Sequence, residues 1–120
     1  MDSILTSIKK LLGIVEEYTH FDADLIMHIN SVFSTLSQIG VGPIEGFAIS
    51  NSYTTWDAFT TDKFILGSVK PYVYLKVKLV FDPPTNSSVL SSMERQISEL
   101  EWRLNLNGEK PHQIRRYKNA

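Results

Sequence analysis

The chain has 120 residues, of which 42% are apolar and 21% are charged, and its formal net charge is −1. This length suits one domain with a modest core, and the composition excludes a disordered or fibrous chain. There is no cysteine, which excludes disulfides and thiolate metal sites and fits a reducing compartment. Charged pairs interrupt the apolar N-terminus, so we expect no signal peptide and no contact with a membrane.

Positive charge is concentrated at the C-terminus. Residues 1–108 carry 8 Lys or Arg and 12 Asp or Glu, a net charge of −4, whereas residues 109–120 carry 4 and 1, a net charge of +3. We therefore divide the chain into a body, residues 1–107, and a polar basic C-terminal tail, residues 108–120.

Two amphipathic helices are predicted at the N-terminus. The first follows Ser3 as its cap and places Lys9 and Lys10 on its far face. The second can be capped by Asp22 and ended by Gly40, which suits a left-handed backbone. The apolar stripes are Ile4, Leu5, Ile8, Leu11, Leu12 and Val15, then Leu25, Ile26, Ile29, Val32, Phe33, Leu36 and Ile39. Their short linker predicts an antiparallel hairpin.

Residues 41–63 have the composition of an irregular loop, with glycine, proline and a Ser/Asn/Thr cluster. Thr55 could cap a short turn within this middle loop. The loop contains four aromatic residues, Phe47, Tyr53, Trp56 and Phe59. Such side chains more often anchor a loop to the core than bind a ligand, and we favour that interpretation.

The segment from Phe64 to Phe81 fits two secondary structures. Its apolar residues alternate as in a half-buried strand, but another set of them recurs at helical spacing. No other segment of comparable length alternates, and a single strand would have no partner, so we predict a helix. Pro71 is tolerable if that helix begins near Ser68, because proline then lies in the first turn.

A final helix is predicted after Pro83 and Pro84. Its possible caps are Asn86, Ser87 and Ser88, and its apolar positions are Val89, Leu90, Met93, Ile97, Leu100 and Leu104. Trp102 falls on another side, and Glu99 can pair with Arg103 along the solvent face. The predicted fold is all-α, a small bundle of about four helices with an irregular middle loop and an extended C-terminal tail.

No motif for catalysis or for metal binding is present. His20, His28 and His112 are too far apart in sequence for a helical metal site. The glycines near residue 42 lack the lysine and the helix start of a phosphate-binding loop. We therefore expect no enzymatic activity, no catalytic residues, no bound metal and no cofactor.

A helical hairpin, an isolated TTWDAF, then VKPYVYLKVKLVFDPP and a closing SMERQISELEWRLN follow one another along the chain. This layout resembles the small head-to-tail connector proteins of tailed bacteriophages. The resemblance covers residues 3 to about 107, and its most specific pieces are YLKVKLVFDPP and ISELEWRLN. In that family these two pieces are consecutive helices joined by a proline turn, which favours the helical interpretation of the third element.

The resemblance implies a structural role in the virion neck. About a dozen copies would form an adaptor ring under the portal, extend the DNA channel and join head to tail. The implied partners are other copies of this chain, the portal protein, the next neck or tail-completion protein, and double-stranded DNA that passes without specific binding. Assembly would take place in the bacterial host cytoplasm, with the protein monomeric until it meets the portal.

Two candidate contact surfaces follow from this resemblance. The tail would dock on the portal through Ile114 and Tyr117 as apolar anchors and Arg115, Arg116 and Lys118 as charge partners. A solvated tail with no fixed partner is the alternative. The middle loop, with Phe47, Tyr53, Trp56 and Phe59, would face either the channel or the adjoining subunit.

Two other functions remain open from the sequence. The basic tail with its interleaved Tyr117 could bind nucleic acid through phosphate contacts and base stacking. The chain could also be a generic helical adaptor outside any virion.

Overall fold

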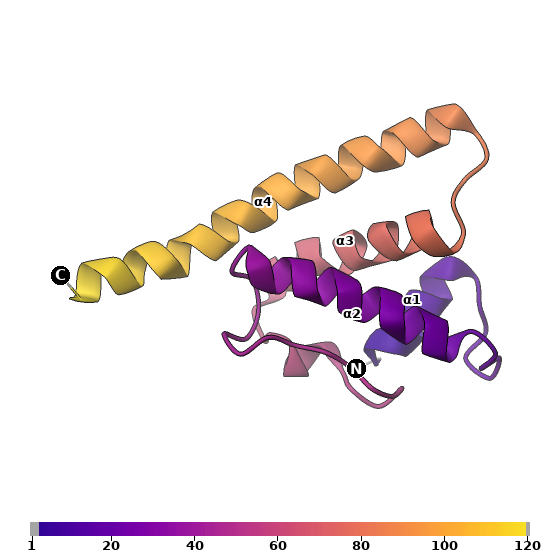
Figure 1. The fold of residues 1–120 in the computed structure, drawn as a ribbon, viewed down its shortest axis with the longest axis horizontal. Coiled ribbons are helices and arrows are strands. Elements are labelled where there is room, and N and C mark those ends of the chain that lie inside the picture. Colours follow the sequence, from indigo (N-terminus) through magenta and orange to yellow (C-terminus); the bar gives the residue numbers. More distant parts are fainter. Residues whose placement is uncertain (1–2, 120) are drawn as a thin grey trace.

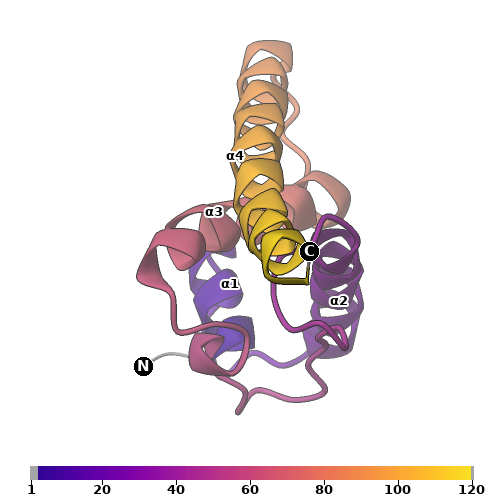
Figure 2. The same ribbon diagram turned by 90° about the vertical axis from the view of Figure 1, so that its left-hand side faces the viewer.

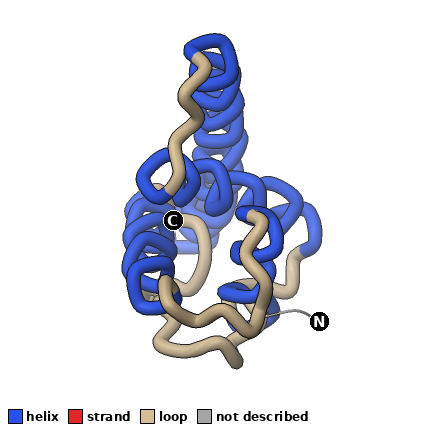
Figure 3. Tube along the Cα trace, turned by 90° about the vertical axis from the view of Figure 1, so that its right-hand side faces the viewer, coloured by secondary structure: helices blue, strands red, loops and turns tan. Residues whose placement is uncertain are grey.

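The computed structural model describes the backbone of residues 3–119 and the side chains of residues 3–108. Its elements are α1 (Ile4–Leu12), α2 (Asp22–Gln38), a short 3₁₀ helix η1 (Trp56–Ala58), α3 (Lys63–Phe81) and α4 (Ser87–Asn119). The described residues form no strand, so the predicted all-α fold is confirmed. Helices α1, α2 and α3 pack together, α4 crosses them on one side, and the middle loop runs along the opposite side (Figures 1 and 3).

Helix α1 begins as predicted but ends earlier. The Ser3 hydroxyl accepts a hydrogen bond from the Thr6 amide at 3.0 Å. Gly13 takes a left-handed backbone with φ of 81° and terminates the helix after Leu12. Val15 therefore lies outside the helix and is 66% exposed, so its predicted place in the apolar stripe is wrong.

Helix α2 begins at Asp22, although Asp22 is not its cap. Phe21 occupies the cap position, where no side chain bonds to the helix, and the Asp22 carboxylate turns instead toward Lys9. At the other end, Gly40 has φ of 83°, which confirms the predicted left-handed termination.

Helix α3 confirms the helical prediction but not its predicted start. Asp62 caps it, because one carboxylate oxygen accepts hydrogen bonds from the amides of Phe64 and Ile65 at 2.9 and 3.3 Å. The helix therefore begins at Lys63, and Pro71 lies in its interior and not in the first turn. An interior proline costs about 3 kcal/mol. Packing of α3 against α1, α2 and α4 offsets that penalty.

The core lies where α3 meets the other three helices. Its fully buried members are Ile4, Leu5, Ile8, Leu25, Ile29, Phe33, Leu36, Trp56, Val69, Tyr72, Val73, Val77 and Leu104. Tyr72 donates a hydrogen bond from its hydroxyl to the Glu101 carboxylate of α4 at 3.2 Å. Burial, followed by the negative charge of Glu101 and this hydrogen bond, raises the pKa of Tyr72 above its ordinary value.

Helix α4 is capped by Asn86, whose side-chain oxygen accepts hydrogen bonds from the amides of Ser88 and Val89. Trp102 points away from the core, and Glu99 pairs with Arg103 at 2.7 Å, both as predicted. Beyond residue 107 the helix continues through the predicted tail to Asn119. Figure 1 shows this C-terminal end projecting past the body as a continuation of α4, and Figure 2 views the molecule from that end.

Candidate functional site

The middle loop is fixed to the body by directed hydrogen bonds. The Asn30 side chain of α2 bonds both the amide and the carbonyl of Ile49, each at 2.8 Å. The Trp56 indole donates to the Ser7 hydroxyl of α1 at 3.1 Å. These contacts satisfy loop polar groups that burial would otherwise leave without partners.

Three of the four predicted loop aromatics anchor the loop. Trp56 and Phe59 are buried and Phe47 is half-buried. The ring of Phe33 in α2 lies 4.9 Å from Phe47 and 5.0 Å from Phe59 between centroids. The anchoring interpretation therefore holds for these residues. Tyr53 differs, because it is 84% exposed and does not anchor the loop to the core.

A groove of about 810 Å³ lies beside the middle loop. Its walls are the C-terminal end of α2, residues 41–44, the loop residues Phe59 and Thr60, Ile65, and Asn105, Asn107 and Gly108 of α4. None of the lining side chains is ionisable. The groove therefore suits a neutral or apolar group rather than a phosphate or a metal ion.

Gly108 marks the point where α4 passes the end of α2. A Cβ atom at this position would collide with the backbone carbonyl oxygen of Ile39. A Cβ at Gly40 would in turn lie 3.3 Å from the Gly108 carbonyl oxygen. Glycine thus permits a close backbone approach at the sequence boundary between body and tail.

Helix α1 contains a buried lysine, Lys9, in its last turn, where the sequence predicted a position on the far face. Lys9 is only 2% exposed. Its ammonium group donates hydrogen bonds to the carbonyl oxygens of Glu16 at 2.8 Å and Tyr18 at 2.7 Å, and lies 2.9 Å from the Asp22 carboxylate. The carboxylate oxygen involved accepts no well-directed hydrogen bond, so that contact is chiefly electrostatic.

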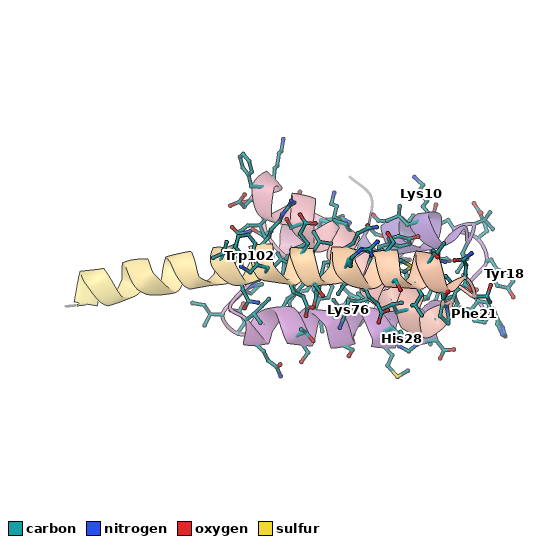
Figure 4. The ribbon with its side chains drawn as sticks, turned by 90° about the horizontal axis from the view of Figure 1, so that it is seen from above. Lys10, Tyr18, Phe21, His28, Lys76 and Trp102 are labelled. Atoms are coloured by element: carbon teal, nitrogen blue, oxygen red, sulfur yellow. The ribbon has the colours of Figure 1, made fainter. Side chains whose placement is uncertain are left out.

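We call residues 14–21, held in this way, the clamped loop. Because the carbonyls of Glu16 and Tyr18 turn inward to Lys9, the side chains around them face solvent, and Tyr18 is 49% exposed. The last residue of the loop, Phe21, packs its ring edge-on against Phe81 of α3, with 5.2 Å between the ring centroids. Figure 4 shows Tyr18 and Phe21 at the end of the molecule opposite the C-terminal end of α4.

Sequence spacing held a signal for the buried lysine. Lys9 is four residues after Leu5 and three before Leu12, which places it on the apolar stripe itself. A charge at such a position requires partners, and the carbonyl groups of a short following loop are the nearest available. Which carbonyl groups reach Lys9 depends on the left-handed turn at Gly13, and the periodicity of apolar residues does not predict them.

The predicted portal-docking residues lie outside the described side chains. They are Ile114, Arg115, Arg116, Tyr117 and Lys118, whose backbone is part of α4.

Four large apolar side chains are exposed on or beside elements that line the groove. They are Ile44, which lines the groove itself, Phe64, Trp102 and Leu106.

Among the described side chains, no group of three or more His, Asp or Glu is arranged to hold a metal ion. No helix in the described part of the chain combines the length and apolar character needed to cross a bilayer.

Comparison with protein families identifies a match to this chain. A family model described as phage connector protein matches residues 4–111, a stretch that includes α1, α2, α3 and most of α4. The chain matches no curated protein and no solved structure.

Proposed function

The chain belongs to the phage connector protein family, and we propose that it forms an adaptor ring of about twelve copies beneath the portal, extending the DNA channel and joining head to tail. Membership of this family implies a structural role in the virion neck. The match over residues 4–111 is the observation that carries the proposal, since it spans the whole body.

The shape of the molecule favours contacts between neighbouring copies along its broad side. The extents are 51 × 35 × 20 Å, so the broad side, with a cross-section of about 1,800 Å², offers a copy more contact area than an end, with about 700 Å². Each copy would then present one side to a different side of its neighbour, as a closed ring requires.

In this ring the C-terminal end of α4 docks on the portal. The segment from residue 109 to 120 carries a charge of +3 on a chain whose remainder carries −4. It also projects past the body, where a partner can surround it (Figure 1). Ile114 and Tyr117 supply apolar anchors, and Arg115, Arg116 and Lys118 supply charge partners.

Passage of DNA through such a ring requires weak contact with phosphates. The negative charge of residues 1–108 supports this, because it limits attraction of the backbone of DNA. We therefore expect the isolated protein to bind duplex DNA weakly in fluorescence titrations at low salt. Strong, salt-sensitive binding would favour the alternative function, a nucleic-acid-binding protein that uses its basic tail.

Light scattering after size-exclusion chromatography tests the proposed assembly. The protein alone should elute as a monomer, and after mixing with its cognate portal it should co-elute with a mass gain of about twelve chains. Electron micrographs of that fraction should show an added ring. A protein that stays monomeric beside unchanged portal would contradict the proposal.

A further inference from the structure

We propose that the clamped loop is the docking surface for the neck component that follows this ring, and that this component offers an apolar side chain flanked by Lys or Arg. The inference rests on the proposed function, because it takes the C-terminal end of α4 to face the portal.

The clamped loop is held in place before any partner arrives. Lys9 joins its two carbonyls and Asp22, at the start of α2, through three contacts of 2.7 to 2.9 Å. The loop is also closed by a hydrogen bond from the Tyr18 amide to the Val15 carbonyl at 3.1 Å. A surface fixed in this way loses little conformational entropy on binding, which favours affinity.

The side chains that this fixed loop presents are those of an interface. Val15 is 66% exposed although it is apolar, and Tyr18 is half-exposed with its ring against His20 and Phe21. Exposed aromatic and aliphatic side chains on a rigid surface are typical anchors of protein interfaces.

Charge identifies the chemistry of the partner. Glu16 and Glu17 lie between the two apolar anchors in sequence, and both are exposed. Asp24 in the first turn of α2 adds a third exposed carboxylate. A partner that brings Lys or Arg around its apolar contact would complement this charge, whereas an acidic partner would be repelled.

Position within the molecule identifies which partner that is. The clamped loop and the C-terminal end of α4 lie at opposite ends of the long axis (Figures 1 and 4). Contacts between copies use the broad side, so both ends remain open in the ring. If the C-terminal end meets the portal, the clamped loop faces away from it, toward the next component of the neck.

The test uses rings of full-length protein on the cognate portal and, as the probe, the purified neck protein that follows the connector in the same phage. Two variants alter the loop, Val15→Ser with Tyr18→Ser and, separately, Glu16→Lys with Glu17→Lys. A matched control, Trp102→Ser, removes an exposed apolar side chain of α4 at the other end of the body (Figure 4). All substituted side chains are exposed, and thermal unfolding verifies that each variant is folded.

Both loop variants should still add a ring to the portal, but they should bind the probe about tenfold or more weakly than the unmodified protein. The control should bind the probe as the unmodified protein does. Unchanged probe binding by the loop variants, or an equal loss in the control, would overturn the inference. If the unmodified protein adds no ring to the portal, the proposed function itself fails, and the inference fails with it.

Discussion

The backbone of Gly108 in α4 lies directly against the carbonyl oxygen of Ile39 at the end of α2. Alanine favours a helix over glycine by up to about 1 kcal/mol. We nevertheless expect Gly108→Ala to destabilise the fold, because its methyl group would collide with that carbonyl and push α4 away from the body. Urea unfolding of the variant measures the sign of the change.

Gly67 provides the matched control for Gly108. It is also a helical glycine, in α3, but a Cβ atom placed there would meet nothing within 4 Å. Gly67→Ala should therefore stabilise the protein by about 0.5–1 kcal/mol, the intrinsic preference alone. Equal effects of the two substitutions would show that the close approach of α4 to α2 is absent.

Replacement of Lys9 by Met should destabilise the protein by about 2–4 kcal/mol. The methionine fills similar volume but leaves the Glu16 and Tyr18 carbonyls and the Asp22 carboxylate without the ammonium group. The lower part of the range allows for partial solvation of Asp22, whose side chain is 24% exposed. Lys63→Met, at an exposed position, should change stability by less than about 0.5 kcal/mol. Chemical denaturation compares the two, and similar effects would disprove the clamp.

The buried hydroxyl of Tyr72 makes stability depend on alkaline pH. Its pKa is raised in the folded protein, so the stabilisation is fully present below the ordinary value of about 10 and is lost as pH rises above it. Above that pH the native protein should lose up to about 1.4 kcal/mol per pH unit relative to Tyr72→Phe, which cannot ionise. Unfolding free energies of both proteins, measured at about four pH values between about pH 8 and 11, give this difference. A constant difference across the range would contradict it.

The side chain of Asn30 should be required for the position of the middle loop. Asn30→Ala removes both hydrogen bonds to the buried Ile49 backbone and should cost about 1–3 kcal/mol. Asn51→Ala, which removes one exposed bond within the loop, should cost less than about 0.5 kcal/mol. Hydrogen exchange at the Ile49 amide should accelerate only in the first variant. Unchanged protection in Asn30→Ala would show that other contacts hold the loop.

Helical periodicity was enough to predict α1, α2 and α4, and the absence of a partner strand decided α3. The start of α3 was missed because Asp62 was not recognised as a cap, while Pro71 suggested a later start. The packing of α3 against three other helices outweighs the local cost of the interior proline, Pro71. The end of α1 was missed because the apolar residue Val15 extended the pattern past Gly13.

The site was less predictable than the fold for a physical reason. Periodicity shows which face of a helix is apolar, but it does not show which loop carbonyls reach a buried lysine such as Lys9. The groove likewise depends on the close passage of α4 at Gly108, between segments far apart in sequence. The loop aromatics Trp56 and Phe59 were predictable as anchors because their size alone favours burial.

A cryo-electron microscopy reconstruction of the cognate portal mixed with this protein tests the central claim most directly. The account predicts one added ring of α-helical subunits in which the C-terminal end of α4 contacts the portal and the clamped loop lies on the far side. A map without an added ring, or a ring whose clamped loops contact the portal, would contradict it.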